Sequence, residues 1–282
     1  MQIYEDIKKD LIDLGIKNGD VVFIRANLAK IGRIKRNIFI NTLLNIVGEE
    51  GTIVTLAFSK SFPFYRVDKN YIFDCNTIPT TGALGKAFLE HNKVLRSSHP
   101  TNSFMAIGKK ANIILENHNE LAMSYDPMYK IVSLNAKMIN IGITSENPGF
   151  TTVHLAQQEL GLTKKSILKN LLRVYYKSSD NEIKLFKRKD IGGCSDGFGK
   201  FYQYYLDKNK LVFGKLGNTN AIVANAKDIY EIDLDLMKKN NSFHFCDNPL
   251  CFICRCTWKY DLKYLPNYLI SKFINFFTKV KN

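Results

Sequence analysis

The sequence predicts a layered α/β/α fold with a central mixed (partly antiparallel) sheet. Short apolar runs of strand length alternate along the chain with amphipathic segments of helix length, which is typical of layered α/β proteins. A polar turn at 178–181 joins two strand-like runs, 171–176 and 182–186, and predicts a hairpin that would make the sheet mixed. The chain of 282 residues is long enough to bury a large core.

The N-terminal part supplies four of the expected elements. Apolar residues at helical spacing or in short buried runs predict a helix over 3–12, a strand over 20–24, a helix over 37–47 and a strand over 52–58. Gly15 and Gly48 follow the two helices as stop signals.

The alternation continues in the rest of the chain. The pattern predicts helices over 82–91, 109–117, 151–160, 198–206 and 226–238, and extended segments over 103–107 and 138–143. Thr151 or Thr152 can cap the helix that ends at residue 160.

Composition and charge limit the class of protein and the kind of ligand. Hydrophobic residues make up 45% of the chain and charged residues 23%, as in ordinary soluble proteins. No run of eighteen apolar residues and no signal peptide is visible, so we expect a cytoplasmic protein with reduced cysteines. Forty Lys and Arg against 26 Asp and Glu give a net charge of +14, which attracts anions such as coenzyme A or nucleotide sugars.

One histidine is the candidate general base. His154 lies at the predicted start of a helix, within Thr151-Thr152-Val153-His154-Leu155-Ala156-Gln157. An imidazole titrates near neutral pH and can take a proton from an attacking amine. His99, in the turn Arg96-Ser97-Ser98-His99-Pro100, fits a structural role at least as well.

Four short motifs follow one another in a specific order. They are Arg25-Ala26-Asn27-Leu28, Arg96-Ser97-x-His99-Pro100-x-x-Ser103, Asp126-Pro127 and Thr151-x-x-His154. From about Gly15 to Leu160 this order resembles the aminoglycoside 3-N-acetyltransferase family. The resemblance implies transfer of an acyl group from acetyl-CoA or another acyl-CoA to the amine of an amino sugar. It also implies that His154 is catalytic and that Arg96, Ser97 and Ser103 contact the cofactor.

Two departures from the family bear on the acceptor. Arg25-Ala26-Asn27-Leu28 stands where the family usually has His-Ser-Ser-Leu, and Gln157 stands where it usually has a glutamate. We expect Gln157 to bind the substrate, so a carboxylate that would attract a cationic antibiotic is missing there. We therefore expect a nucleotide-linked amino sugar of surface-glycan biosynthesis as the acceptor, with an aminoglycoside as the alternative.

The remaining site residues are assigned from their chemistry. Asn27 can hydrogen-bond the pantetheine amides, and Arg25 can meet a phosphate, so both are expected to bind the cofactor. A catalytic histidine needs a group that orients its other ring nitrogen. Asp196, in a glycine-rich loop, is the expected acid, with Asp190 and Glu159 as alternatives.

The resemblance also frames the domain organisation. We expect 1–282 to form a single N-acyltransferase domain. The alternative is two lobes, 1–165 for acyl-CoA and 166–282 for the acceptor side and the C-terminal tail. The apolar segment 265–277 predicts a helix that docks on the body or on a second copy of the chain, or that lies on an anionic membrane surface.

A cluster of thiols near the C-terminus is unusual. Cys246, Cys251, Cys254 and Cys256 fall within eleven residues, and His244 precedes them. Because the spacing fits no common zinc module, we assign no metal ligand and expect reduced cysteines packed under Trp258. A zinc site there is the alternative, as is a non-enzymatic zinc or nucleic-acid-binding protein. Dispersed basic residues argue against a nucleic-acid partner.

Overall fold

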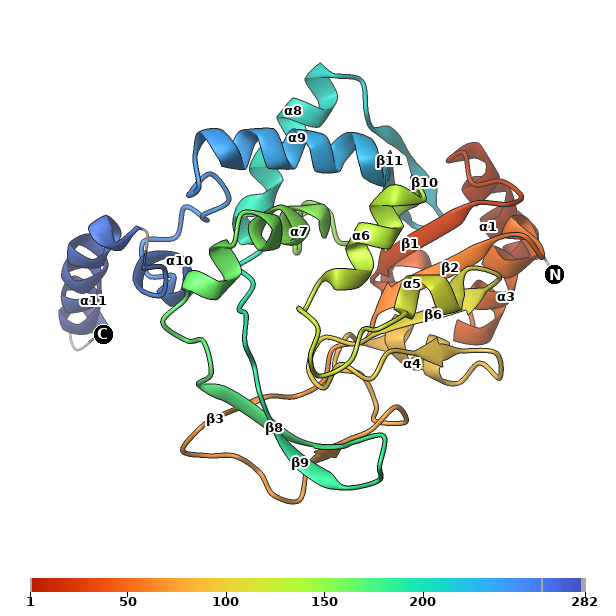
Figure 1. Cartoon of the computed structure of the whole chain (residues 1–282). Coiled ribbons are helices and arrows are strands. Elements are labelled where there is room, and N and C mark those ends of the chain that lie inside the picture. The colour runs from red at the N-terminus through yellow and green to blue at the C-terminus, as the bar shows by residue number, and fades with distance from the viewer. Residues whose placement is uncertain (1, 260, 280–282) are drawn as a thin grey trace.

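The computed structural model describes residues 2–259 and 261–279 and contains a central seven-stranded sheet, with strand order β10-β11-β7-β1-β2-β6-β5 (Figure 1). These strands are β1 (Val21–Ala26), β2 (Thr52–Leu56), β5 (Leu95–Arg96), β6 (Phe104–Gly108), β7 (Lys137–Ile141), β10 (Val212–Leu216) and β11 (Thr219–Asn225). β7, β1 and β2 are parallel, and the other four pairings are antiparallel. The predicted mixed sheet is therefore confirmed.

Helices cover both faces of this sheet, which confirms the layered α/β fold (Figure 1). Val22 and Ile24 of β1 pack with the helices of one face, whereas Val21 and Phe23 pack with those of the other. The first face carries α1 (Gln2–Asp13), α3 (Arg36–Val47) and α4 (Ala83–Leu89). The second carries α5 (Ala111–Leu115), α6 (Asp126–Ser133), α7 (Thr152–Glu159), α8 (Phe201–Asp207) and α9 (Ala226–Lys239).

The sequence explains why β1 occupies the centre. A parallel strand covered on both faces reads as a continuous apolar run, and Val21-Val22-Phe23-Ile24 is almost completely buried. The strand becomes polar only at Arg25, where its carboxyl end reaches the edge of the sheet. α3 ends at Gly48 as predicted, with φ of 64°, a conformation that favours glycine.

The predicted hairpin is present, but it lies in a separate sheet. β8 (Leu172–Lys177) and β9 (Ile183–Lys187) pair with each other, and β8 also pairs with β3 (Phe62–Pro63) and β4 (Ile72–Phe73). Val174, Tyr176 and Phe186 bury their side chains against Phe73, so the hairpin has its own small core. The expectation that this hairpin makes the central sheet mixed was wrong, because β6, β5, β11 and β10 do so.

The central sheet draws on both halves of the chain. β10 and β11 follow residue 165. β11 pairs with β7 and β10 pairs with β11, so the sheet crosses the suggested lobe boundary. The other helical segments are α2 (Leu28–Ile31), η1 (Leu162–Lys165), η2 (Asp196–Lys200), α10 (Phe252–Cys256), η3 (Leu262–Tyr264) and the longer α11 (Leu265–Lys279).

The predicted C-terminal helix is α11, which lies at the edge of the molecule, far from the central sheet (Figure 1). Leu269 and Phe273 are among its exposed apolar residues. Contact with a membrane surface or with a second copy stays a prediction. In the part of the chain that the structure describes, no helix is both long and apolar enough for a membrane span.

Candidate active site

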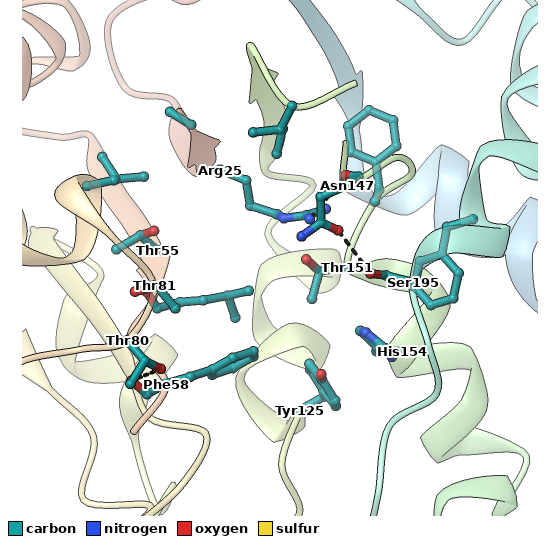
Figure 2. Close-up of a pocket in the computed structure, with 16 residues that line it drawn as sticks. Arg25, Thr55, Phe58, Thr80, Thr81, Tyr125, Asn147, Thr151, His154 and Ser195 are labelled. Carbon is teal, nitrogen blue, oxygen red and sulfur yellow. Dashed lines mark hydrogen bonds between the residues drawn. The ribbon is translucent and has the colours of Figure 1, made fainter. Parts of the chain in front are cut away.

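A cavity of about 360 Å³ opens where the parallel strands β1, β2 and β7 end. Carboxyl ends of parallel strands are the usual place for ligand sites in α/β sheets. The walls are formed by residues at or after these strand ends, at the start of α7, and in the loops around 58, 80, 125 and 195 (Figure 2). Arg25, Thr55, Asn147, Thr151 and His154 are among the polar residues in the lining.

The imidazole of His154 forms part of the cavity wall, and two aromatic rings hold it there (Figure 2). The ring of Tyr125 stacks on it at 4.6 Å with an angle of 16° between the planes. The ring of Phe198 meets it edge-on, with a centroid distance of 4.8 Å. The imidazole is therefore fixed in position by packing on two sides.

A hydrogen bond fixes the tautomer of His154. Its Nδ1 lies 2.8 Å from Oε1 of Gln157, one turn further along α7. The N–H of Gly193 also donates to this oxygen, at 3.3 Å, which assigns the orientation of the amide. An amide oxygen can only accept, so Nδ1 carries the proton and Nε2 keeps a free lone pair.

The surroundings keep His154 uncharged. Burial lowers its pKa to about 4, and the positive charges of Arg25 and Arg188 act in the same direction, although the bond to Gln157 opposes them. At neutral pH the ring is therefore ready to accept a proton.

The glycine-rich loop before η2 closes around this pair. A Cβ on Gly192 would lie 3.1 Å from Nδ1 of His154, and a Cβ on Gly193 would lie 2.6 Å from Nε2 of Gln157. The loop backbone can approach the two side chains only because neither position carries a side chain.

Gln157 has a different role from the expected substrate contact. Its side chain is fully buried and is absent from the cavity lining. Since its oxygen binds His154, the geometry makes it the residue that orients the base.

The expected acid, Asp196, does not reach His154. Asp196 is exposed at the start of η2, and Nδ1 of His154 is already bound to Gln157. Asp190 accepts bonds from the N–H and the hydroxyl of Ser124, both at 2.9 Å. Glu159 is bound by the hydroxyl of Tyr129. None of the three acids therefore orients the base.

Arg25 lines the cavity, but its guanidinium is held by the chain itself. Nη1 donates to the carbonyl of Gly149 at 2.9 Å, and Nη2 donates to the carbonyl of Asn147 at 3.3 Å. Burial lowers its pKa. Asn27 lies just beyond the strand, is partly exposed, and is not part of the lining. Cofactor contacts by these two residues stay predictions.

Arg96 ties several loops together. Its Nε and both terminal nitrogens make five hydrogen bonds within the protein, and the guanidinium lies 5.1 Å from the ring centroid of Phe73. The acceptors are the carbonyls of Ala57, Cys75 and Thr77 and the hydroxyls of Ser59 and Ser103. With all its N–H groups engaged, Arg96 fits a structural role better than the expected phosphate contact.

The two serines of the same motif are also engaged. The Ser103 hydroxyl donates to the carbonyl of Ala57 at 2.6 Å, and the Ser97 hydroxyl accepts from the N–H of Phe104 at 2.9 Å. Both are buried and neither lines the cavity. The geometry favours loop-holding roles over the cofactor contacts that the resemblance implies.

The sequence reasoning missed Tyr125, which supports the base directly. Its N–H donates to Oε1 of Gln158, whose Nε2 donates to Asp126. Tyr125 directly precedes Asp126-Pro127, one of the four motifs in the sequence, and this position was a usable signal.

The charged groups in the cavity lining are all of one sign. No Asp or Glu occurs in its lining, whereas Arg25 contributes a cation. The walls thus offer hydroxyls, an amide and aromatic rings, and no carboxylate that would pair with a positively charged ligand.

Known proteins are similar to this chain in sequence and in fold. The sequence model described as aminoglycoside 3-N-acetyltransferase matches residues 23–238. The SPbeta prophage-derived aminoglycoside N(3')-acetyltransferase-like protein YokD of Bacillus subtilis (strain 168) is 26% identical over 244 residues, which cover 77% of this chain and 85% of YokD.

Solved structures share the fold. The apoenzyme of aminoglycoside acetyltransferase AAC(3)-IVa has a TM-score of 0.72 at 18% identity, covering 89% of this chain and 94% of its own. AAC-IIIb in a binary complex with CoASH has a TM-score of 0.70 at 20% identity, covering 84% and 96%. Because the family match spans most of the chain, the protein belongs to the aminoglycoside 3-N-acetyltransferase family, whose members are coenzyme A-dependent N-acyltransferases.

Proposed function

We propose that the protein transfers an acetyl group from acetyl-CoA to an amine of an aminoglycoside, with His154 as the general base. The observation that carries this proposal is the bond from Nδ1 of His154 to Gln157. It leaves Nε2 as an unprotonated acceptor on an imidazole that lines the cavity.

The reaction follows from these positions. The amine nitrogen attacks the thioester carbonyl, and Nε2 of His154 takes the proton that the nitrogen loses as the N–C bond forms. The C–S bond then breaks, and the proton passes to the departing thiolate, giving an amide and free coenzyme A. Gln157 accepts from Nδ1–H throughout and holds the ring in this tautomer.

The acceptor class rests on the family and its relatives. The matched family model and the similar proteins carry aminoglycoside acetyltransferase names, which supports this acceptor over the nucleotide-linked sugar expected from the sequence.

One observation still favours a second candidate, a nucleotide-linked amino sugar. The cavity wall contains Arg25 and no carboxylate, and the whole chain carries a charge of +14. Such a field draws in an anionic sugar nucleotide and opposes a polycation.

Release of coenzyme A thiol, measured with purified protein, acetyl-CoA and two sets of acceptors, tests both candidates. Turnover with aminoglycosides supports the proposed function, and turnover only with UDP- or dTDP-linked amino sugars supports the second candidate. Thiol release with neither set would contradict both.

A pair of variants tests the base. His154→Ala should lower kcat by at least about 10²-fold, the lower end for loss of a general base. His91→Ala, just beyond the C-terminal end of α4 and outside the cavity lining, serves as the matched control and should keep normal turnover. Equal activities of the two variants would exclude His154 as the base.

A further inference from the structure

Four cysteine sulfurs converge beside the glycine-rich loop. The Sγ atoms of Cys194, Cys246, Cys251 and Cys254 all lie within 4.8 Å of one another. None of these cysteines is in a disulfide. Cys194 comes from the loop that contacts His154, and the other three come from the C-terminal segment.

This grouping differs from the one that the sequence indicated. Cys256 and His244, which are neighbours of the cluster in the sequence, are not part of it, and Cys194, more than fifty positions earlier, takes the fourth place. The fourth cysteine of the cluster therefore comes from a distant part of the sequence.

We propose that these four cysteines bind one Zn²⁺ as a structural site. Tetrahedral zinc with Zn–S bonds of about 2.3 Å has sulfur–sulfur edges of about 3.8 Å. The observed limit of 4.8 Å requires only a small contraction onto the ion. Four protein sulfurs fill the coordination sphere and leave no position for a reactive water, so the site is structural.

The surroundings suit such an ion. Cys246 and Cys254 are buried and pack with Phe245 and Trp258, while Cys194 and Cys251 are partly exposed and leave an entry path. Binding converts four thiols to thiolates and releases four protons to solvent, so the filled site carries a charge of −2.

Two cations are positioned next to this charge. The Arg255 guanidinium donates to the backbone carbonyls of Cys246 and Asn248, and the Lys200 ammonium donates to the carbonyl of Phe245 at 2.8 Å. These three bonds also brace the backbone that presents the sulfurs.

The site would anchor the loop that supports the base. A Cβ on Gly197 would lie 2.3 Å from the carbonyl oxygen of His244, so the loop backbone presses directly on the C-terminal segment. Cys194 follows Gly193, whose N–H donates to Gln157. A zinc ion bound to Cys194 would thus hold the neighbouring Gly193, and with it the contact between the loop and Gln157, in place.

The test measures metal in the full-length protein, purified without a histidine tag or chelator. Elemental analysis is expected to give about one zinc per chain. Cys254→Ser should lose most of this zinc, whereas Cys256→Ser should retain it. Cys256 is the matched control because it is buried in the same short helix and lies outside the cluster.

A second measurement does not depend on a variant folding. Zinc released from wild-type protein by a thiol reagent should appear together with modification of these four cysteines, and Co²⁺ exchanged into the site should show the absorption of tetrahedral tetrathiolate coordination. Active wild-type protein that contains no zinc overturns the proposal. Stoichiometric iron, a disulfide within the cluster, or equal zinc in the two serine variants overturns it as well.

Discussion

Nδ1 of His154 donates to Oε1 of Gln157 at 2.8 Å, so an uncharged amide orients the catalytic imidazole. A carboxylate in that place would hold the ring in the same tautomer and would also stabilise the imidazolium formed when the base takes a proton. An amide supplies the orientation without the charge. The consequence is a base whose pKa, lowered mainly by burial to about 4, remains far below neutrality.

Gln157→Glu should raise the pKa of His154 from about 4 toward neutral pH. The new carboxylate favours the protonated ring, so the ring will bind a proton at higher pH than in the wild type. NMR titration of the imidazole protons measures this pKa directly. At low pH, kcat/KM falls because the base is protonated, and the pH at which it falls should rise together with this pKa.

Gln157→Leu completes the series. Leucine has a similar volume and cannot accept a hydrogen bond from Nδ1–H of His154, so the ring should lose its fixed tautomer and kcat should fall by about 10-fold or more. An unchanged pKa in the glutamate variant, together with normal kcat in the leucine variant, would show that Gln157 does not act on the base.

Gly193→Ala should disturb the hydrogen bond between Gln157 and His154 by a steric clash. The added methyl would lie 2.6 Å from Nε2 of Gln157, and the side chain would have to move away from His154. Displacement of a catalytic group by about 1 Å can cost up to about 10²-fold in rate. Gly199→Ala is the matched control, because its methyl would find only ordinary contact with Pro148, at 3.4 Å. Steady-state kcat for both variants decides the matter, and equal values would contradict the role of the loop.

Much of the fold was accessible from the sequence because its signals are local. The apolar run at 20–24 predicted a buried strand, which is β1, and His154 was predicted at the start of a helix, which is α7. These features depend on residues close together in the chain, and the periodicity of apolar residues predicts such local structure well.

The parts that the sequence did not reveal depend on long-range contacts. Cys194 and Cys254 are sixty positions apart, and only the folded loop brings their sulfurs together. Asp196 was expected to orient His154 because it lies in a glycine-rich loop. In the structure it is exposed to solvent at the start of η2. Which sheet receives a hairpin is likewise decided by the partner surface, here Phe73, and not by the hairpin's own pattern.

Arg96→Lys should lower the free energy of unfolding and should have little effect on the binding of acetyl-CoA. Lysine offers three N–H donors in place of five and cannot span the same acceptors, so some of the three carbonyls that Arg96 binds would lose a partner. The free energy of unfolding should fall by at least about 2 kcal/mol. Chemical denaturation measures this loss, and the KM for acetyl-CoA should change little. A KM raised tenfold or more with unchanged stability would instead support a phosphate contact.

Stability should also decline in acid because of a stacked pair of buried histidines. The rings of His99 and His118 stack at 4.8 Å, and burial lowers the pKa of His118 to about 3 and that of His99 well below its usual value. An unfolded histidine binds a proton below about pH 6.5, whereas these two stay neutral in the folded protein. The unfolded state therefore holds more protons between pH 6.5 and the folded pKa values, and the free energy of unfolding falls as the pH drops through that range.

His118→Gln isolates one member of this pair. Each histidine that is neutral only when folded contributes a slope of up to about 1.4 kcal/mol per pH unit in this range, and the variant should lack one such contribution. Urea denaturation at several pH values from 7 to 4.5 gives the slope for wild type and variant. His91→Gln should change the slope less, because the His91 side chain is only partly buried. If the wild type and His118→Gln lose stability at the same rate as the pH falls, His118 must already take up its proton in the folded protein, and burial cannot be the reason for the acid sensitivity.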